Sequence, residues 1–249
     1  MSALVSIITP CYNSARFINE CISSVLEQTY TNWELIIVDD ASNDNSRELI
    51  SNIAERDNRI KYVFLTKNIG VAGARNIALE MSAGRYIAFL DSDDVWKEEK
   101  LTTQIDFMQL HNISFSFSSY QPMSENGMEF FREIKVPSKV DYNFYLKNTI
   151  IGCLTVVLDK DKLSDFKMPK LRTSQDMALW LSIMKGGVVA YGIEKSLAFY
   201  RIVGNSNTSN KFKVIQGVWR IYRVEEGLGL VMSIWCFVNY AFNAIKKRI

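Results

Sequence analysis

Short apolar runs alternate with amphipathic segments along the first hundred residues of the chain. The first run is rich in β-branched residues and stops at Pro10, which is typical of a strand buried on both faces. The predicted strands comprise residues 4–9, 33–38, 61–65 and 86–90, and the predicted helices comprise residues 14–28, 42–53 and 71–81. Ser14 begins the first helix as a predicted N-cap. This alternation predicts a mostly parallel sheet with helices on both faces.

The pattern changes after residue 96 and predicts a mixed α+β half. The expected helices are 97–110, 176–185 and a segment ending near 226, the expected strands are 113–120, 153–158, 188–191 and 197–202, and the expected loops are 121–139 and 204–211. We therefore expect a single domain over 1–227, with a first half of residues 1–96 and a second half of residues 97–227.

The C-terminal segment 228–249 differs in kind. Its first eighteen residues carry no charge, and Lys246, Lys247 and Arg248 follow them. Its predicted apolar face comprises Val231, Ile234, Val238, Ala241, Phe242 and Ile245, with Trp235 and Tyr240 at the expected depth of lipid headgroups. This pattern favours an amphipathic helix lying on an anionic membrane surface. The alternative is a C-terminal helix packed on the domain or on a partner.

Composition and charge narrow the class of protein. Hydrophobic residues make up 48% of the chain, which predicts a folded protein. The net charge of +2 provides no general field for nucleic acid, so no nucleic-acid partner is expected. The four cysteines show no CxxC pair and His111 is the single histidine, so neither a disulfide framework nor a zinc site is expected. No signal peptide is recognised, and we expect the chain to stay in the reducing cytosol.

The strongest chemical signal is the acidic segment Asp91-Ser92-Asp93-Asp94, directly after an apolar strand. Carboxylates together with phosphate oxygens are a usual way to hold Mg²⁺ or Mn²⁺, so the segment predicts a site for a metal and a diphosphate. The alternative is an acidic N-cap for the next helix, an interpretation that applies best to Asp94.

A second acidic pair, Asp39-Asp40, ends the second strand at the same edge of the predicted sheet. Carboxylates at such an edge accept hydrogen bonds from a base or a ribose, although simple capping is an alternative. The sequence after the first strand, Pro10-Cys11-Tyr12-Asn13, offers an aromatic face for a base but no glycine-rich cradle. That absence argues against a dinucleotide site and a P-loop.

Several motifs in this order resemble the inverting family-2 glycosyltransferases of GT-A fold. The matching segments are Ser6-Ile7-Ile8-Thr9-Pro10 with Tyr12-Asn13, Val38-Asp39-Asp40 with Ser42 and Asp44, Asn68-Ile69-Gly70 with Ala74-Arg75-Asn76, Asp91-Ser92-Asp93-Asp94 with Trp96, and, more loosely, Ser174-Gln175-Asp176 with Leu179-Trp180, and Tyr200-Arg201. The resemblance covers nearly the whole first hundred residues. It implies a Rossmann-like sheet, an acceptor-binding second half and a C-terminal helical tail.

The resemblance also implies roles for individual residues. Asp93 would bind Mn²⁺ or Mg²⁺, and Asp176 would be the catalytic base that takes the proton from the acceptor hydroxyl. The nucleotide-sugar would contact Pro10, Tyr12, Asp40, Arg75, Asp91, Ser92 and Arg201, and the acceptor would contact Gln175 and Trp180. Two residues depart from the family's pattern: Gln175 replaces a common Glu, and Val203 stands in a loop where a His is frequent.

Three of these residues have alternative interpretations from the sequence alone. Asp176 is equally suited to be a helix N-cap, and the two roles are compatible. Arg75 can bind the nucleotide-sugar or pair with Asp40. Arg201 can reach a diphosphate or lie on the surface.

The predicted function is transfer of a sugar from a nucleotide-sugar to a saccharide acceptor, with a UDP-sugar as the expected donor. If the C-terminal segment binds membrane, we expect the acceptor to be lipid-linked. The expected context is synthesis of a cell-surface polysaccharide such as O-antigen, capsule or teichuronic acid, at the cytoplasmic face of the plasma membrane. The alternatives are transfer directly to a polyprenyl phosphate, and a non-catalytic module that binds a nucleotide or a sugar.

Overall fold

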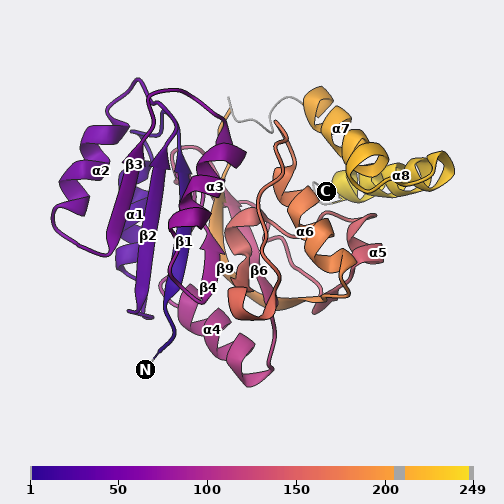
Figure 1. Cartoon of the computed structure of the whole chain (residues 1–249), viewed down its shortest axis with the longest axis horizontal. Helices are drawn as coiled ribbons and strands as arrows, with labels where there is room; N and C mark the ends of the chain where they lie inside the picture. The colour runs from indigo at the N-terminus through magenta and orange to yellow at the C-terminus, as the bar shows by residue number, and fades with distance from the viewer. Residues whose placement is uncertain (1, 205–210, 247–249) are drawn as a thin grey trace.

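The computed structural model of the chain describes residues 2–204 and 211–246. The polar loop 205–210 and the basic residues Lys247 and Arg248 lie outside the described residues. A central sheet is covered by helices on both faces, and two C-terminal helices, α7 and α8, stand out at one end (Figure 1).

The first half has the predicted alternation of strands and helices. Its elements are β1 (Val5–Cys11), α1 (Ile18–Leu26), β2 (Trp33–Asp39), α2 (Ser46–Ala54), β3 (Ile60–Phe64), α3 (Val71–Met81) and β4 (Tyr86–Phe89). The four strands are parallel, in the order β3-β2-β1-β4. Both faces of β1 and β2 are buried along their whole length, which explains why these strands are uninterrupted apolar runs.

The second half adds shorter elements of mixed direction. They are β5 (Val95–Trp96), α4 (Lys100–Leu110), β6 (Phe115–Met123), β7 (Lys139–Val140), α5 (Tyr142–Tyr145), the 3-10 turn η1 (Cys153–Thr155), β8 (Val157–Asp159), the 3-10 turn η2 (Lys160–Lys162), α6 (Gln175–Lys185), β9 (Ala190–Arg201), α7 (Lys211–Arg220), the π-helical turn η3 (Ile221–Glu225) and α8 (Leu230–Lys246). The sheet continues from β4 as β8-β6-β9-β5, and β7 pairs with β9. β8 is antiparallel to β4 and β6, whereas β6 and β9 are parallel.

Several predicted boundaries were wrong in this half. The strands expected at 188–191 and 197–202 are one strand, β9, because β6, β7 and β5 pair along its length. The same pairing extends β6 into the expected loop 121–139. The strand expected at 153–158 begins as a 3-10 turn, because the Thr155 N–H and hydroxyl both donate to the Gly152 carbonyl, at 3.0 and 2.7 Å.

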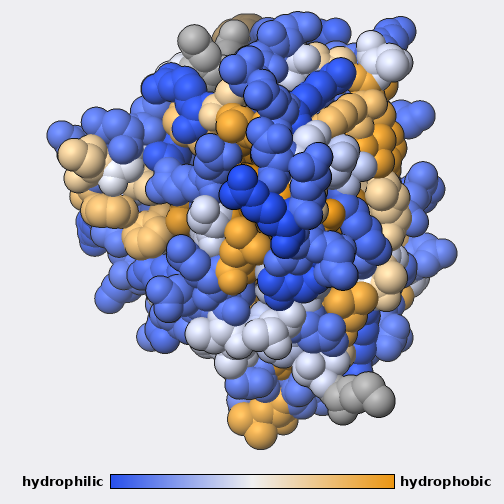
Figure 2. Space-filling view, turned by 90° about the vertical axis from the view of Figure 1, so that its left-hand side faces the viewer, coloured by the Kyte–Doolittle hydropathy of each residue, from blue (hydrophilic) through white to orange (hydrophobic). Residues whose placement is uncertain are grey.

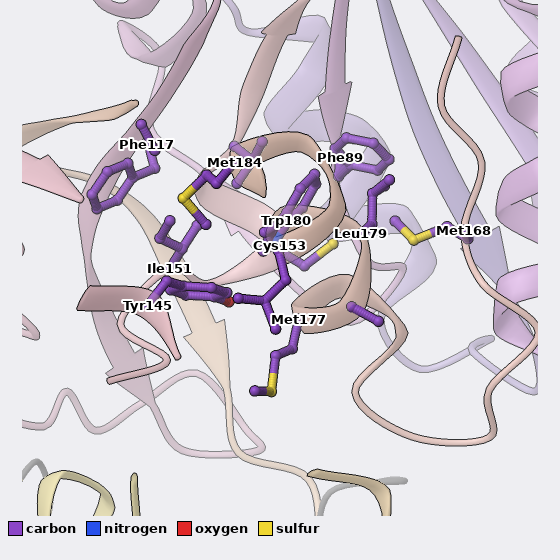
Figure 3. Close-up of a cluster of buried hydrophobic side chains, with 14 of the residues drawn as sticks. Phe89, Phe117, Tyr145, Ile151, Cys153, Met168, Met177, Leu179, Trp180 and Met184 are labelled. Atoms are coloured by element: carbon purple, nitrogen blue, oxygen red, sulfur yellow. The ribbon is translucent and has the colours of Figure 1, made fainter. Parts of the chain in front are cut away.

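Two apolar cores lie on opposite faces of the sheet. One contains buried residues of α1, α2 and α4, and the other contains buried residues of α3, α5, α6 and α8. The centre of the second core is formed by α6 and the sheet (Figure 3). Helices on both faces leave the carboxyl edge of the parallel strands as the place where a ligand can bind.

The helix α8 packs on the domain with one face and leaves its other face exposed, and contact of that exposed face with a membrane stays a prediction. Ser233 and Cys236 are buried against the domain, and Asn243 Nδ2 donates to the Lys147 carbonyl at 3.0 Å. The opposite face is exposed and apolar, with large side chains at Val231, Ile234, Trp235, Val238 and Phe242. Tyr240 is not on that face, since it packs on the core beside Phe237. Within the described residues, no helix is both long and apolar enough to cross a membrane.

A continuous exposed apolar face like that of α8 is not found on every side of the molecule. The side that carries the β3 edge of the sheet is mostly hydrophilic, with scattered apolar residues (Figure 2). Scattered apolar residues are normal for a protein surface, whereas a continuous exposed apolar face indicates a contact surface. The exposed face of α8 is therefore a feature that function has to explain.

Candidate active site

The carboxyl ends of β1, β2 and β4 lie together, because these strands are parallel neighbours. The segments that leave them contain Tyr12 after β1, Asp40 after β2 and Asp91 after β4. The structure therefore brings three of the predicted donor-binding residues to one edge of the sheet, which is where open α/β sheets bind their ligands.

The loop after β1 is held against the loop after β2 by polar contacts. Asn13 has a left-handed backbone, with φ of 50°; its N–H donates to Ser42 Oγ at 2.8 Å and its Oδ1 accepts the Asn43 N–H at 2.8 Å. The Ser14 N–H donates to Ser46 Oγ at 2.9 Å. These contacts leave Tyr12 50% exposed, so one face of its ring is available to a planar ligand.

Ser14 does not have its predicted role. The N-cap of α1 is Phe17, and the helix begins at Ile18. The Ser14 carbonyl accepts the N–H groups of Phe17 and Ile18, both at 2.9 Å, and its hydroxyl lies 2.7 Å from that of Ser92. Ser14 thus connects the loop after β1 to the acidic segment.

Pro10 is buried within β1 rather than in the loop. Pairing of β1 with β4 ends at Ile8, and backbone groups of a strand point alternately to its two neighbours, so Pro10 faces the side where the β4 ladder has ended. A proline is tolerated there because no ladder hydrogen bond is lost. Its ring supports the strand end that carries Tyr12.

Asp40 organises the start of α3. Its Oδ1 accepts the Ile69 N–H at 2.7 Å and its Oδ2 accepts the Gly70 N–H at 2.8 Å, while Asn68 Nδ2 donates to its carbonyl at 2.9 Å. Gly70 has φ of 84°, a backbone conformation that favours glycine. With only 3% of Asp40 exposed, its carboxylate orders the Asn68-Ile69-Gly70 loop, and its predicted contact with a base stays a prediction.

Arg75, which is buried, forms an ion pair with the partly exposed Asp91 beside this loop. Arg75 Nη2 donates to Asp91 Oδ1, so the predicted alternative in which Arg75 pairs with Asp40 was wrong. Burial disfavours the charged guanidinium, but the negative charges of Asp91 and Asp176 outweigh it and raise the pKa of Arg75 above its usual range. Arg75 therefore remains a cation between the end of β4 and the start of α6.

The other aspartates of the acidic segment have different surroundings. Asp94 is buried and its Oδ1 accepts the Arg201 N–H at 2.8 Å. It does not cap α4, whose N-cap is Glu99. Burial and the charges of Asp93 and Asp91 raise the pKa of Asp94 well above its usual range. Asp94 is therefore a structural link between the acidic segment and β9.

Asp93 is the carboxylate of this segment best suited to hold a cation. Asp91 is paired with Arg75 and Asp94 with the Arg201 backbone, whereas no side chain of the described residues contacts the Asp93 carboxylate directly in a hydrogen bond or an ion pair. Burial and the nearby charge of Asp91 raise the pKa of Asp93 to about 6, and a bound cation would relieve that repulsion. The described residues contain no group of three or more metal-binding side chains, so the donor set fits a cation shared with phosphate oxygens.

Arg201 is buried, with 3% exposed, so the prediction of a surface arginine was wrong. Its Nε donates to the Asp93 carbonyl at 2.8 Å, its Nη1 to the Glu125 carbonyl at 3.0 Å, and its Nη2 to the Glu20 carboxylate. These bonds fix the backbone on which Asp93 sits. The predicted contact of Arg201 with a diphosphate stays a prediction.

Asp176 lies in the first turn of α6, but it is not the N-cap, because that position is taken by Ser174. Burial raises the pKa of its carboxyl, while the charge of Arg75 and the Met177 N–H lower it. The net effect is a raised pKa, as expected for a group whose task is to take a proton near neutral pH. The charge of Arg75 thus acts on both Asp91 and Asp176.

The two predicted acceptor contacts differ in their accessibility. Gln175 is buried, and its Oε1 has no hydrogen-bond partner among the described residues. Trp180 is fully buried in the same cluster as Phe89 (Figure 3). Its ring lies 5.4 Å from that of Phe89 and 5.3 Å from that of Phe115. Trp180 is therefore a core residue, and its predicted contact with the acceptor was wrong because helical periodicity places it on the inner face of α6.

Two charged residues of this region were missed by the sequence analysis. Glu20 binds Arg201, and Arg47 Nε donates to Asp39 Oδ1 at 2.7 Å. Glu20 and Arg201 are 181 residues apart. In the sequence, Glu20 and Arg47 have the pattern of solvent-exposed helix positions, so no local signal marks these two residues.

Known proteins share the sequence pattern and the fold of this chain. The model of the family described as glycosyl transferase family 2 matches residues 6–158. TuaG of Bacillus subtilis, assigned to teichuronic acid biosynthesis, is 48% identical over 99% of this chain and 98% of its own length. WfgD of Escherichia coli, named as a UDP-Glc:α-D-GlcNAc-diphosphoundecaprenol β-1,3-glucosyltransferase, is 43% identical over 98% of this chain and 95% of its own length.

Solved structures share the fold at low identity. TarS of S. aureus (residues 1–349, with UDP-GlcNAc) matches 95% of this chain and 71% of its own with a TM-score of 0.73 at 20% identity. The mannosyltransferase PcManGT of Pyrobaculum calidifontis, solved with GDP-Man and Mn²⁺, matches 96% and 73% with a TM-score of 0.69 at 17% identity.

Proposed function

The chain belongs to glycosyl transferase family 2, and from this premise we propose that it transfers a sugar from a UDP-sugar to the saccharide of a lipid-linked diphosphate acceptor. The observation that carries the proposal is the electrostatic connection made by Arg75, which pairs with Asp91 after β4 and acts on Asp176 in α6. A donor at the strand ends and an acceptor at α6 would meet around this arginine.

The donor side of the proposal rests on the carboxyl edge of β1, β2 and β4. The exposed ring of Tyr12 is available to stack on the base, and Asp91 and Ser92 stand where a ribose or a diphosphate would lie. WfgD, which matches over nearly the whole chain, carries UDP-Glc in its name. UDP is therefore the proposed nucleotide.

Asp93 is the proposed metal ligand, with diphosphate oxygens completing the shell. A bound Mn²⁺ or Mg²⁺ would supply charge neutralisation for the departing diphosphate. The chain itself holds Asp93 in place through Arg201. The Arg201 Nε donates to the Asp93 carbonyl and the Arg201 N–H donates to Asp94 Oδ1, so two contacts fix the acidic segment.

Asp176 is the proposed general base. It takes the proton of the acceptor hydroxyl while that oxygen forms a bond to the anomeric carbon, and the bond between this carbon and the diphosphate oxygen breaks, releasing UDP with inversion. The positive charge of Arg75 opposes the rise in the Asp176 pKa that burial causes, and so favours the unprotonated carboxylate that can act as a base.

The acceptor and the location are proposed from the second half of the chain. WfgD is named for a GlcNAc-diphosphoundecaprenol acceptor, and the exposed apolar face of α8 suits contact with a lipid surface. We propose that the enzyme works as a peripheral protein at the cytoplasmic face of the plasma membrane, in the synthesis of a cell-surface polysaccharide.

The decisive variant is Asp176→Asn. The amide keeps the size of the side chain but cannot take a proton, so kcat at saturating acceptor should fall by about 10²–10⁴ while UDP affinity and melting temperature stay near those of the parent. The measurement is transfer from a UDP-sugar panel to a saccharide diphosphate lipid. Asp165→Asn, at an exposed loop position, is the matched control.

Persistence of near-parental transfer by Asp176→Asn would remove Asp176 from the mechanism. Transfer to polyprenyl phosphate itself, without a saccharide, would instead contradict the proposed acceptor.

A further inference from the structure

An apolar groove lies between α7 and α8. It has a volume of about 450 Å³ and is lined by Ile215, Gln216, Trp219 and Arg220 of α7 and by Phe237 of α8. The rings of Trp219 and Phe237 meet edge to face at 5.8 Å and hold the two helices together there. The volume is within the range of small-ligand sites, although the groove is open to solvent on one side.

Charge at the groove has a single sign on the α7 side. Arg220 is exposed, and its only ion pair among the described residues is a loose one, with Nε 3.8 Å from Glu225 Oε1. The neighbouring acid Glu226 is already bound by Lys185 at 3.1 Å and by the Tyr142 hydroxyl at 2.6 Å. Arg220 therefore has donors available for an anion at the rim of an apolar groove.

The opposite side of α7 is attached to the segment that leads to Asp176. A Cβ added at Gly217 would lie 2.3 Å from Thr173 Oγ1, and the Thr173 hydroxyl donates to the Lys213 carbonyl at 3.4 Å. Thr173 precedes Asp176 by three residues, and Arg220 follows Gly217 by one helical turn, about 5 Å along the axis. Thr173 thus connects α7 to the segment that leads into α6 and Asp176.

These observations favour one kind of occupant. An apolar wall with a cation at its rim matches a chain of apolar units that carries a phosphate, and the same helix α8 also has an exposed apolar face.

We propose that the α7–α8 groove binds the first isoprenoid units of a polyprenyl diphosphate acceptor, with Arg220 contacting its phosphate. This inference rests on the proposed function and specifies where the lipid part of the acceptor binds. Binding of the lipid would place the attached saccharide toward α6, because α7 is packed on Thr173.

The test uses the full-length protein in detergent, so that no membrane surface contributes. Ile215→Asp puts a charge in the wall of the groove, and Val224→Asp puts the same charge at an exposed position of η3 outside it. The KM for a saccharide-diphosphate acceptor with a long polyprenyl chain should rise about tenfold in Ile215→Asp, with kcat unchanged. The KM for the same saccharide diphosphate on a methyl group should not change, and Val224→Asp should match the parent in both assays.

A second measurement is independent of transfer. Geranylgeranyl monophosphate should bind the parent, as followed by intrinsic tryptophan fluorescence, and should bind Ile215→Asp about tenfold more weakly. Arg220→Gln should weaken the binding of geranylgeranyl monophosphate but leave the binding of the uncharged alcohol geranylgeraniol unchanged.

The outcomes separate this inference from the proposed function. Equal lipid binding and equal KM for the parent and Ile215→Asp would overturn the groove site even if transfer occurs. Lipid binding that depends on Ile215 and Arg220, in a protein that transfers to no diphosphate acceptor, would support the groove and contradict the proposed function. Weakened binding of Ile215→Asp to vesicles that lack polyprenyl lipid, with unchanged binding of geranylgeranyl monophosphate, would overturn the groove in favour of a general membrane contact.

Discussion

Neighbouring aspartates in this protein differ because each has different partners. In the segment Asp91-Ser92-Asp93-Asp94, one carboxylate pairs with Arg75, one accepts the Arg201 N–H, and Asp93 makes neither kind of contact. A carboxylate that is desolvated, repelled by its neighbours and not paired is costly unless a cation arrives. Residue surroundings, and not residue type, therefore select the proposed metal ligand.

Removal of Asp93 tests that selection. We expect Asp93→Ala to abolish the Mn²⁺-dependent part of UDP binding, because the proposed site has one protein carboxylate. The melting temperature should not fall, because the negative charge of Asp93 raises the pKa of buried Asp94 and its removal relieves that repulsion. Calorimetric titration of UDP with and without Mn²⁺ measures the effect, and Asp106→Ala on α4 is the exposed control. Retained metal dependence in Asp93→Ala would place the cation elsewhere.

Lys100 is a second residue whose surroundings decide its properties. It is fully buried, its Nζ donates to Gln104 Oε1 and lies 4.4 Å from the centre of the Trp96 ring, and burial lowers its pKa to about 7. An unfolded chain has the ordinary lysine pKa of about 10.4. Between these two values the unfolded chain binds a proton that the folded protein does not, so the contribution of Lys100 to stability rises with pH across that window.

Lys100→Met should remove this pH dependence. At pH 7 and below we expect the variant to be more stable by about 1–3 kcal/mol, because methionine fills a similar volume without a buried charge. The gain should shrink as the pH rises toward 10. Denaturant unfolding at a series of pH values measures it, and Lys160→Met, at an exposed lysine, should change stability by less than about 0.5 kcal/mol. A constant difference between parent and Lys100→Met at all pH values would contradict the assigned cause.

At the scale of elements, α8 combines two faces with different tasks. Its inner face is part of the core through Cys236 and Phe237, so deleting the helix would unfold more than the helix itself. Its outer face has Val231 83% exposed and Trp235 and Val238 also exposed. Membrane contact has to be tested on that outer face without disturbing the inner one.

Charges on the outer face provide such a test. The triple variant Val231→Glu, Trp235→Glu and Val238→Glu should lose most of its binding to phosphatidylglycerol vesicles, because it loses apolar burial and gains repulsion from the anionic surface. Its melting temperature and its turnover on a soluble acceptor should stay near those of the parent. Leu110→Glu, at an 80% exposed position at the end of α4 and away from α8 in Figure 1, is the control in a vesicle sedimentation assay. Undiminished sedimentation of the triple variant would leave α8 as a packing element alone.

At the scale of the whole molecule, Arg201 joins the two halves of the chain. It sits at the end of β9 and binds the Glu20 carboxylate of α1, the Asp93 carbonyl after β4 and the Glu125 carbonyl in the loop after β6. The continuous sheet brings these segments to one edge, next to the proposed donor-binding residues of the first half. The proposed site exists only in the complete sheet.

Local sequence pattern was enough to predict the parallel half of the sheet and the position of its acidic strand ends. Strands buried on both faces need continuous apolar runs, and the polar segments that follow parallel strands must meet at one edge, so both features can be predicted from local pattern. The helix Val71–Met81 was predicted with its boundaries because its apolar residues recur with helical spacing. The glycosyltransferase family could also be recognised, because its motifs occur at these strand ends.

Which of those polar residues remain free to act depends on contacts between distant segments of the chain. Arg201 is buried through its contact with Glu20, which is 181 residues away along the chain. Trp180 is inaccessible to an acceptor because Phe89 and Phe115 pack against it. The length of β9 and the turn at Cys153 also depend on partners far along the chain. Burial and hydrogen-bond partners come from contacts between distant segments, so the pKa of Asp93, the pairing of Arg75 and the groove between α7 and α8 have no local signature in the sequence.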